Sequence, residues 1–85
     1  MARIQRSTRR GKKWMVKKNG KTIHAGDSNY SIGVGTKRGN NYCTRSFGIK
    51  GKTGSMTANG LARKMWGCVG KRSVKSRAGK IGGRY

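Results

Sequence analysis

Residues 13–25, KWMVKKNGKTIHA, carry the clearest structural signal in this chain. Asn19-Gly20 separates two runs rich in strand-forming residues. This dipeptide is typical of a two-residue type I′ turn, in which both central positions need a positive φ. The sequence therefore predicts a β-hairpin. Its register opposes three pairs of residues: Lys18 with Lys21, Val16 with Ile23, and Trp14 with Ala25.

The predicted register gives the hairpin two different faces, because directly opposed residues point to the same side of a sheet. The apolar face consists of Trp14, Val16, Ile23 and Ala25, and the other face consists of Met15, Lys17, Thr22 and His24. The turn and the hydrophobic pattern thus select the same register. Lys18 opposite Lys21 is mildly destabilising unless an anion lies between them.

A second signal lies at residues 55–67, SMTANGLARKMWG, which predict one short helix. Ser55 or Thr57 can cap its first turn, and Gly67 suits the position after its last turn. An apolar face is predicted by an i, i+4, i+7 spacing, at Leu61, Met65 and Cys68. We expect this helix to pack on the hairpin, because so short a helix is not stable alone.

The polar residues of this helix should lie away from the core. Arg63 and Lys64 are expected to point away from the apolar face. Asn59 and Gly60 lower the helix propensity, so about two turns are expected.

The rest of the central region gives weaker signals. Residues 26–41 are expected to form turns and loops, with an Asx-type turn at Asp27-Ser28-Asn29. Residues 42–49, YCTRSFGI, are a candidate third strand, although their apolar residues do not alternate cleanly. Residues 50–54, KGKTG, are expected to form a flexible basic loop.

We therefore expect a small α+β fold: an N-terminal β-hairpin, a candidate third strand and one short helix, flanked by extended basic arms. The arms are residues 1–12 and 69–85, and the core with its Gly-rich loops is residues 13–68. Few Ile, Leu, Val and Phe residues are present, so the apolar area that folding can bury barely offsets the loss of conformational entropy. Folding is expected to depend on a partner, either nucleic acid or a protein shell.

Composition excludes several functions. The 85 residues contain 22 Lys and Arg against a single acid, Asp27, which gives a formal net charge of +21. One acid is too few for paired-carboxylate catalysis or for an oxygen-ligand Ca²⁺ or Mg²⁺ site. No apolar run approaches the roughly 20 residues that span a bilayer, and the Arg-rich start lacks a signal-peptide core. We expect a protein that is not an enzyme and has no membrane or small-molecule partner.

Cys43, Cys68 and His24 are the only soft metal ligands. Zinc sites usually combine four ligands that include closely spaced pairs, which this chain lacks, so no metal site is expected. Two reduced, partly buried thiols are the first expectation, and a Cys43–Cys68 disulfide that staples a small core is the alternative. Nothing in the sequence brings Cys43 and His24 together as a nucleophile and its base.

The aromatic residues are scattered among the basic ones. Exposed aromatic rings beside Lys and Arg can stack on nucleic-acid bases. Trp14 and Trp66 are expected to form most of the core, whereas Tyr30, Tyr42 and Tyr85 are better candidates for such contacts.

Residues 13–27, KWMVKKNGKTIHAGD, resemble a signature of small basic proteins encoded by DNA viruses and phages, approximately K-[YW]-x-V-x-x-N-G-K-x-I-H-F-G-D. The distinctive positions that match are Trp14, Val16, Asn19, Gly20, Lys21, Ile23, His24, Gly26 and Asp27. Ala25 departs from the pattern, which often has Phe there. Residues 37–46, KRGNNYCTRS, look similar to phage members. The resemblance implies a virus-encoded, virion-associated basic protein without enzyme activity.

The net charge indicates the class of partner. A compact chain with this charge repels itself, whereas an anionic polymer removes the repulsion and gains affinity through counterion release. We expect a structural virion protein that lies inside the capsid and neutralises genomic DNA without reading its sequence. During assembly it would be present in the host cytoplasm or nucleus. The expected phosphate contacts are Arg3, Arg6, Arg9, Arg10, Lys12, Lys13, Lys17, Lys18, Lys21, Lys37, Arg38, Lys71, Arg72, Lys75, Arg77, Lys80 and Arg84.

Two alternatives use the same composition. A minor capsid or cement protein would thread basic arms between capsid subunits and bind acidic protein surfaces. A ribosomal protein would use the same arms as rRNA-binding tails. Capsid or other virion proteins are expected partners in the first two interpretations.

Overall fold

The N-terminal hairpin is present in the register that the sequence predicts. A computed structural model describes residues 2–27 and 33–85, and in it β2 (Lys12–Lys18) pairs antiparallel with β3 (Lys21–Asp27). Asn19 (φ 51°) and Gly20 (φ 77°) adopt the positive φ values that the turn requires. The predicted pairs are confirmed: Lys18 with Lys21, Val16 with Ile23, and Trp14 with Ala25.

The third strand of the sheet precedes the hairpin instead of following it. β1 (Gln5–Arg6) pairs antiparallel with β2, and the strand order is β1-β2-β3. Ile4, the residue before β1, is completely buried in the core. The candidate strand at residues 42–49 is therefore wrong, and so is the expectation that the basic N-terminal segment is an extended arm. A basic segment can join a sheet because the pairing uses its backbone.

Residues 42–47 belong instead to α1 (Lys37–Phe47), which also replaces the loop expected at residues 37–41. Thr36 caps the helix, and its hydroxyl accepts a hydrogen bond from the Gly39 amide (3.2 Å). The buried positions are Gly39, Cys43 and Ser46, which follow helical spacing. The strand interpretation failed because this buried face is built from small and polar residues, which a search for apolar periodicity misses. The Asx-type turn expected at Asp27-Ser28-Asn29 extends beyond the described residues.

The helix predicted at residues 55–67 is confirmed as α2 (Ala58–Met65). Thr57 caps it by accepting a hydrogen bond from the Gly60 amide (2.9 Å), and Gly67 follows the helix with φ 67°. Its apolar face packs on the apolar face of the hairpin. The buried core consists of Ile4, Trp14, Val16, Ile23, Ala25, Leu61 and Met65, with Trp66 partly buried against it. Trp14 lies in the core as predicted.

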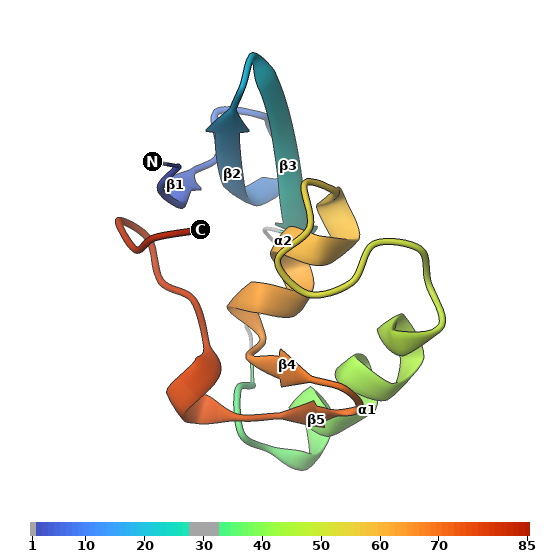
Figure 1. Cartoon of the computed structure of the whole chain (residues 1–85). Helices are drawn as coiled ribbons and strands as arrows, with labels where there is room; N and C mark the ends of the chain where they lie inside the picture. The colour runs from blue at the N-terminus through green and yellow to red at the C-terminus, as the bar shows by residue number, and fades with distance from the viewer. Residues whose placement is uncertain (1, 28–32) are drawn as a thin grey trace.

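The C-terminal segment also folds back, so the expected C-terminal arm is wrong. β4 (Cys68–Val69) and β5 (Arg72–Ser73) form a small hairpin against α1, and a 3-10 turn, η1 (Lys75–Arg77), follows. The chain then returns to its start, where the Ile4 amide donates to the Gly83 carbonyl (2.8 Å) and the Gly82 amide donates to the Ile4 carbonyl (2.7 Å). Figure 1 shows the two chain ends next to each other at the sheet.

Tyr85 anchors the C-terminal end. Its amide donates to the Ala2 carbonyl (3.0 Å), and its hydroxyl donates to the Ser55 carbonyl. Burial raises the pKa of Tyr85 to about 12. The radius of gyration of 11.7 Å matches the value of about 12 Å expected for a compact chain of this length.

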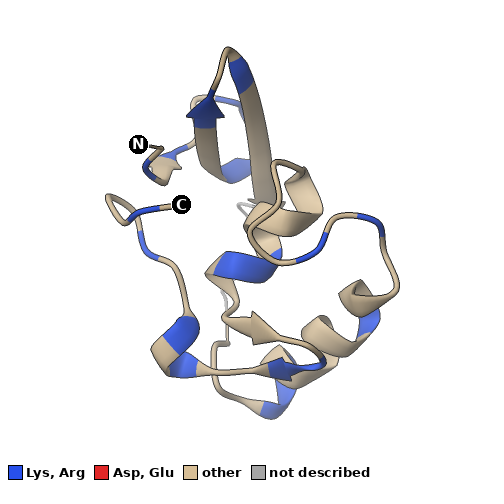
Figure 2. Cartoon of the chain, viewed as in Figure 1, with Lys and Arg blue, Asp and Glu red and all other residues tan. Residues whose placement is uncertain are grey.

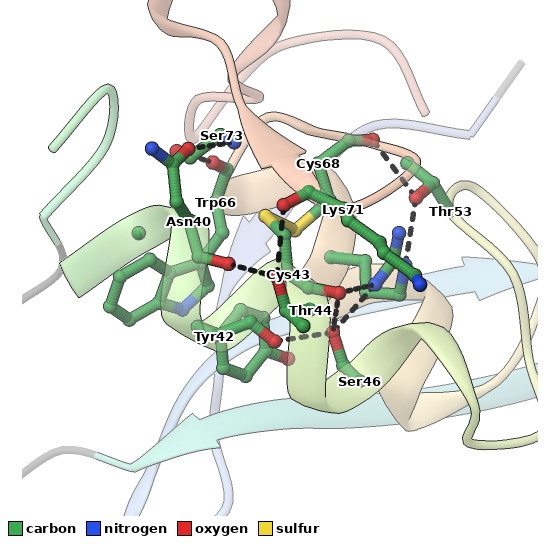
Figure 3. The surroundings of a disulfide bond; sticks show 12 residues. Asn40, Tyr42, Cys43, Thr44, Ser46, Thr53, Trp66, Cys68, Lys71 and Ser73 are labelled. Atoms are coloured by element: carbon green, nitrogen blue, oxygen red, sulfur yellow. Dashed lines mark hydrogen bonds between the residues drawn. A yellow bond between two sulfur atoms is a disulfide. The ribbon is translucent and has the colours of Figure 1, made fainter. Parts of the chain in front are cut away.

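A disulfide joins Cys43 of α1 to Cys68 of β4, so the expectation of two reduced thiols is wrong and the alternative is confirmed. The two Cα atoms lie 5.4 Å apart, and both residues are buried. The pairing follows from α1, because a helix at residues 37–47 turns Cys43 toward the interior. Figure 3 shows the bond enclosed by residues from α1, the end of α2 and the β4–β5 hairpin.

Arg63 does not point into solvent as predicted, because it is only 3% exposed. Its guanidinium donates four hydrogen bonds, to the Thr53 hydroxyl (3.0 Å), the Cys43 carbonyl (2.8 Å), the Ser46 hydroxyl (2.6 Å) and the Gly70 carbonyl (2.5 Å). The prediction assumed that α2 buries one face. In the structure α2 lies between the hairpin and α1, so a second face is covered as well.

Candidate nucleic-acid interface

The lysines and arginines cover the surface of the molecule. Of these 22 residues only Arg63 is buried, Lys13 and Lys64 are partly buried, and the others are exposed. Figure 2 shows them on both helices and on every strand except β4, from the tip of the β2–β3 hairpin to the C-terminal segment. Since the chain has one acid, internal carboxylates cannot neutralise them. Their charge is available to an external anion.

The tip of the hairpin concentrates three exposed cations, Lys17, Lys18 and Lys21. Lys18 and Lys21 are directly opposed across the two strands, as predicted. Like charges at this position repel each other, and an anion between them would remove the repulsion. The tip is therefore suited to a phosphate group.

His24 reports the positive potential on the same side of the hairpin. Its Nδ1 lies 2.8 Å from the Ser7 hydroxyl, with which it shares a hydrogen bond. The pKa of His24 is lowered from 6.5, first by partial desolvation and then by the nearby charges of Arg9, Lys17 and Lys12. The coulombic part of this shift, from Arg9, Lys17 and Lys12, is the part that would also favour an anion beside the ring.

A cleft of about 580 Å³ opens where the start of β2 meets both helices. Three cations line it, Lys12 from β2 and Arg38 and Arg45 from α1. The rings of Tyr42 and Trp66 line it as well, and they stack on each other with centroids 4.7 Å apart and planes inclined at 23°. Figure 3 shows these two side chains together beside the disulfide.

The geometry of α1 explains how these groups meet. Arg38, Tyr42 and Arg45 are spaced i, i+4, i+7, which places all three on one face of the helix. Arg45 was not among the predicted contacts because residues 42–49 were expected to form a strand. The spacing R-x₃-Y-x₂-R was the signal that could have found it.

A second depression, of about 400 Å³, lies at the N-terminal side of the sheet. Arg6, Lys12 and Lys13 line it together with Trp14 and Ile81. Lys12 thus stands between the two hollows. On the opposite end of the molecule the ammonium of Lys71 lies 5.4 Å from the centroid of the Phe47 ring.

The structure does not gather the predicted phosphate contacts into one site. Lys12 and Arg38 meet at the first cleft, Arg6, Lys12 and Lys13 at the second depression, and Lys17, Lys18 and Lys21 at the hairpin tip. Arg3 uses its guanidinium to donate to the Gly82 carbonyl (3.0 Å). The remaining exposed residues of the predicted set line neither hollow and lie away from the hairpin tip: Arg9, Arg10, Lys37, Lys71, Arg72, Lys75, Arg77, Lys80 and Arg84.

Of the three tyrosines predicted to stack on bases, the two that the structure describes lie in different surroundings. Tyr42 lines the first cleft, and burial, the largest influence, raises its pKa. Tyr85 is occupied with Ser55 in the fold, and Tyr30 lies outside the described residues. Trp66, which was expected in the core, is only partly buried and contributes to the cleft.

The described residues were also considered for a metal site and for a membrane-spanning helix. Within residues 2–27 and 33–85, His, Cys, Asp and Glu nowhere gather in a group of three that could hold a metal ion. Neither helix in this part of the chain is long and apolar enough to cross a membrane. Comparison with protein-family models, curated proteins and solved structures finds no match to this chain.

Proposed function

We propose that this protein is a non-enzymatic nucleic-acid-binding protein that neutralises phosphates without reading the base sequence. The observation that carries the proposal is the number and exposure of its cations. The chain has 22 basic residues and one acid, and all but one of the basic residues reach solvent. Each exposed cation that meets a phosphate releases a condensed counterion, and this release drives the binding.

The dimensions of the molecule support contact with a packed polymer. A duplex carries one phosphate per about 1.7 Å of its axis, so a charge of +21 matches about 36 Å of duplex, or roughly ten base pairs. The longest dimension of the protein is 34 Å. Because the cations lie on several sides, one molecule would touch more than one stretch of nucleic acid, which suits a protein that condenses a genome.

We further propose that the polymer is the genomic DNA inside a virus particle. The support is the resemblance of residues 13–27 and 37–46 to small basic proteins of DNA viruses and phages. In a particle the exposed cations would offset the repulsion between neighbouring DNA segments, and capsid proteins would be the other partners.

Binding is tested by fluorescence anisotropy with labelled duplexes of unrelated sequence over a series of salt concentrations. We expect equal affinity for each sequence and a log–log slope of several units, because each phosphate contact contributes about −0.9 to the slope on duplex DNA. A triple variant, Lys17→Gln, Lys18→Gln and Lys21→Gln, should flatten the slope. Affinity that does not change with salt would refute the proposal.

Location is tested on purified particles. After the particles are opened and treated with nuclease, a genome-binding protein should leave with the digested nucleic acid. A chain that remains with the empty shell would instead be a cement protein, and one that cosediments with ribosomes would be a ribosomal protein.

A further inference from the structure

We infer that the cleft formed by Lys12, Arg38, Tyr42, Arg45 and Trp66 binds an unpaired nucleotide, with its base against the aromatic rings and its phosphates on the cations. This inference rests on the proposed function and deepens it. It predicts that a protein which binds all polynucleotides through charge also prefers strands whose bases are free.

The size and lining of the cleft fit such a ligand. Its volume of about 580 Å³ lies within the range of pockets that hold small ligands. Elsewhere on the described surface the cations adjoin single rings, such as Phe47 beside Lys71. Here two rings already stack, with their planes inclined at 23°, and a planar base can extend that stack.

The cations stand at the positions that a nucleotide needs. Arg38 and Arg45 flank Tyr42 on the same face of α1, one turn to either side, and Lys12 approaches from β2. All three side chains are exposed, so they can reach phosphates on both sides of a bound base. Arg guanidinium groups also stack on bases themselves.

A paired base cannot use this site without leaving its duplex. In a double helix each base is covered above and below by its neighbours, and removing it costs the free energy of stacking and pairing. An unpaired base already has an exposed face, so placing it against the rings costs less free energy. The cleft would thus favour single-stranded segments, while the other surface cations would bind single and double strands alike.

The experiment compares two single strands of the same length, an oligothymidylate and a strand of abasic sugar-phosphate, which carry the same phosphates. We expect the wild-type protein to bind the oligothymidylate about fivefold or more tightly than the abasic strand, since stacking one base on an aromatic ring contributes at least about that factor. Thymidine monophosphate forms the third arm, because binding as tight as that of the oligomer would indicate a free nucleotide as the ligand. Equal affinity for the two strands would overturn the inference.

Variants locate the preference. Trp66→Leu and Tyr42→Leu should each reduce the difference between the strands, with circular dichroism to show that the fold persists. Phe47→Leu is the matched control, because Phe47 is an exposed ring, 54% accessible, outside the cleft. A preference that Phe47→Leu removes and Trp66→Leu leaves intact would place the site elsewhere and overturn the inference.

The two proposals fail in different ways. If the protein bound neither strand nor duplex, the proposed function would be wrong. If it bound duplex and abasic strand with steep salt dependence but showed no preference for bases, the function would stand and the nucleotide site would be wrong. Tryptophan fluorescence gives an independent readout, since Trp66 should be quenched by the oligothymidylate and not by the abasic strand.

Discussion

Reduction of the Cys43–Cys68 disulfide should remove a large part of the stability of this fold. The bond closes a loop with a sequence separation of 25. For a loop of this length, loss of the cross-link restores chain entropy worth about 3.5 kcal/mol at 25 °C. A domain of 85 residues has a total free energy of unfolding of about 4–13 kcal/mol. Reduction should therefore remove between about a quarter and nearly all of the free energy of unfolding.

The assay is guanidinium unfolding followed by tryptophan fluorescence, with and without a phosphine reductant. Reduction should lower the denaturation midpoint, and the double variant Cys43→Ala/Cys68→Ala should show a similar loss to which the reductant adds nothing. Titration of thiols must first find none in the native protein and two after reduction. If thiols were released and the midpoint did not move, the reasoning from loop closure would be refuted.

Three further outcomes follow from other contacts. Arg63→Ala removes the donor of four hydrogen bonds and should lower the free energy of unfolding by about 3 kcal/mol or more. The control, Lys64→Ala, should change it by less than about 1 kcal/mol. Equal effects of the two variants in urea unfolding would show that the Arg63 contacts are not formed. The pKa of His24 is lowered from 6.5, so the folded protein prefers the neutral ring, and stability should be complete above pH 6.5 and decrease as the pH falls below it. His24→Gln should flatten that dependence, and in NMR titrations the pKa of His24 should rise when a polyanion binds; an unchanged value would argue against an anion at this face. Deletion of residues 82–85 should lower Tm and accelerate hydrogen exchange at the Ile4 amide, whereas a disordered arm could be removed without either effect.

The parts of the fold that the sequence predicts correctly are those decided by neighbouring residues. Asn19-Gly20 requires a particular turn, and that turn determines the whole register of β2 and β3. Thr57 and Gly67 mark the two ends of α2 in the same local way. These signals need no information about distant contacts.

The parts that were missed depend on distant contacts. Gly39 of α1 is buried so closely against β5 that a Cβ at this position would lie only 2.7 Å from the Cβ of Ser73. Nothing near residue 39 in the sequence reveals this approach. The supposed arms fold because Ile4 and Tyr85 anchor their ends, and single anchors among basic residues leave no periodic pattern.

The candidate site likewise has one feature that the sequence predicts and one that it does not. Its charge could be predicted from composition, since most of 22 cations had to be exposed. Its cleft could not, because it requires α1, α2 and β2 to bring Arg45, Trp66 and Lys12 to one place. The wrong strand at residues 42–49 was sufficient to conceal it.

Arg63 shows why stability and binding should be separable in this protein. Its buried charge is balanced by carbonyl and hydroxyl groups, and its hydrogen bonds to Cys43 and Ser46 lie in the last two turns of α1, where the helix dipole is negative. The buried guanidinium thus needs no carboxylate as a partner. Among the described residues, every buried polar side-chain atom has a hydrogen-bond partner. The exterior cations, by contrast, have almost nothing inside the molecule to balance them. Substituting the exposed cations should therefore weaken binding and leave the fold intact. Substituting Arg63 should destabilise the fold and leave the binding cations in place.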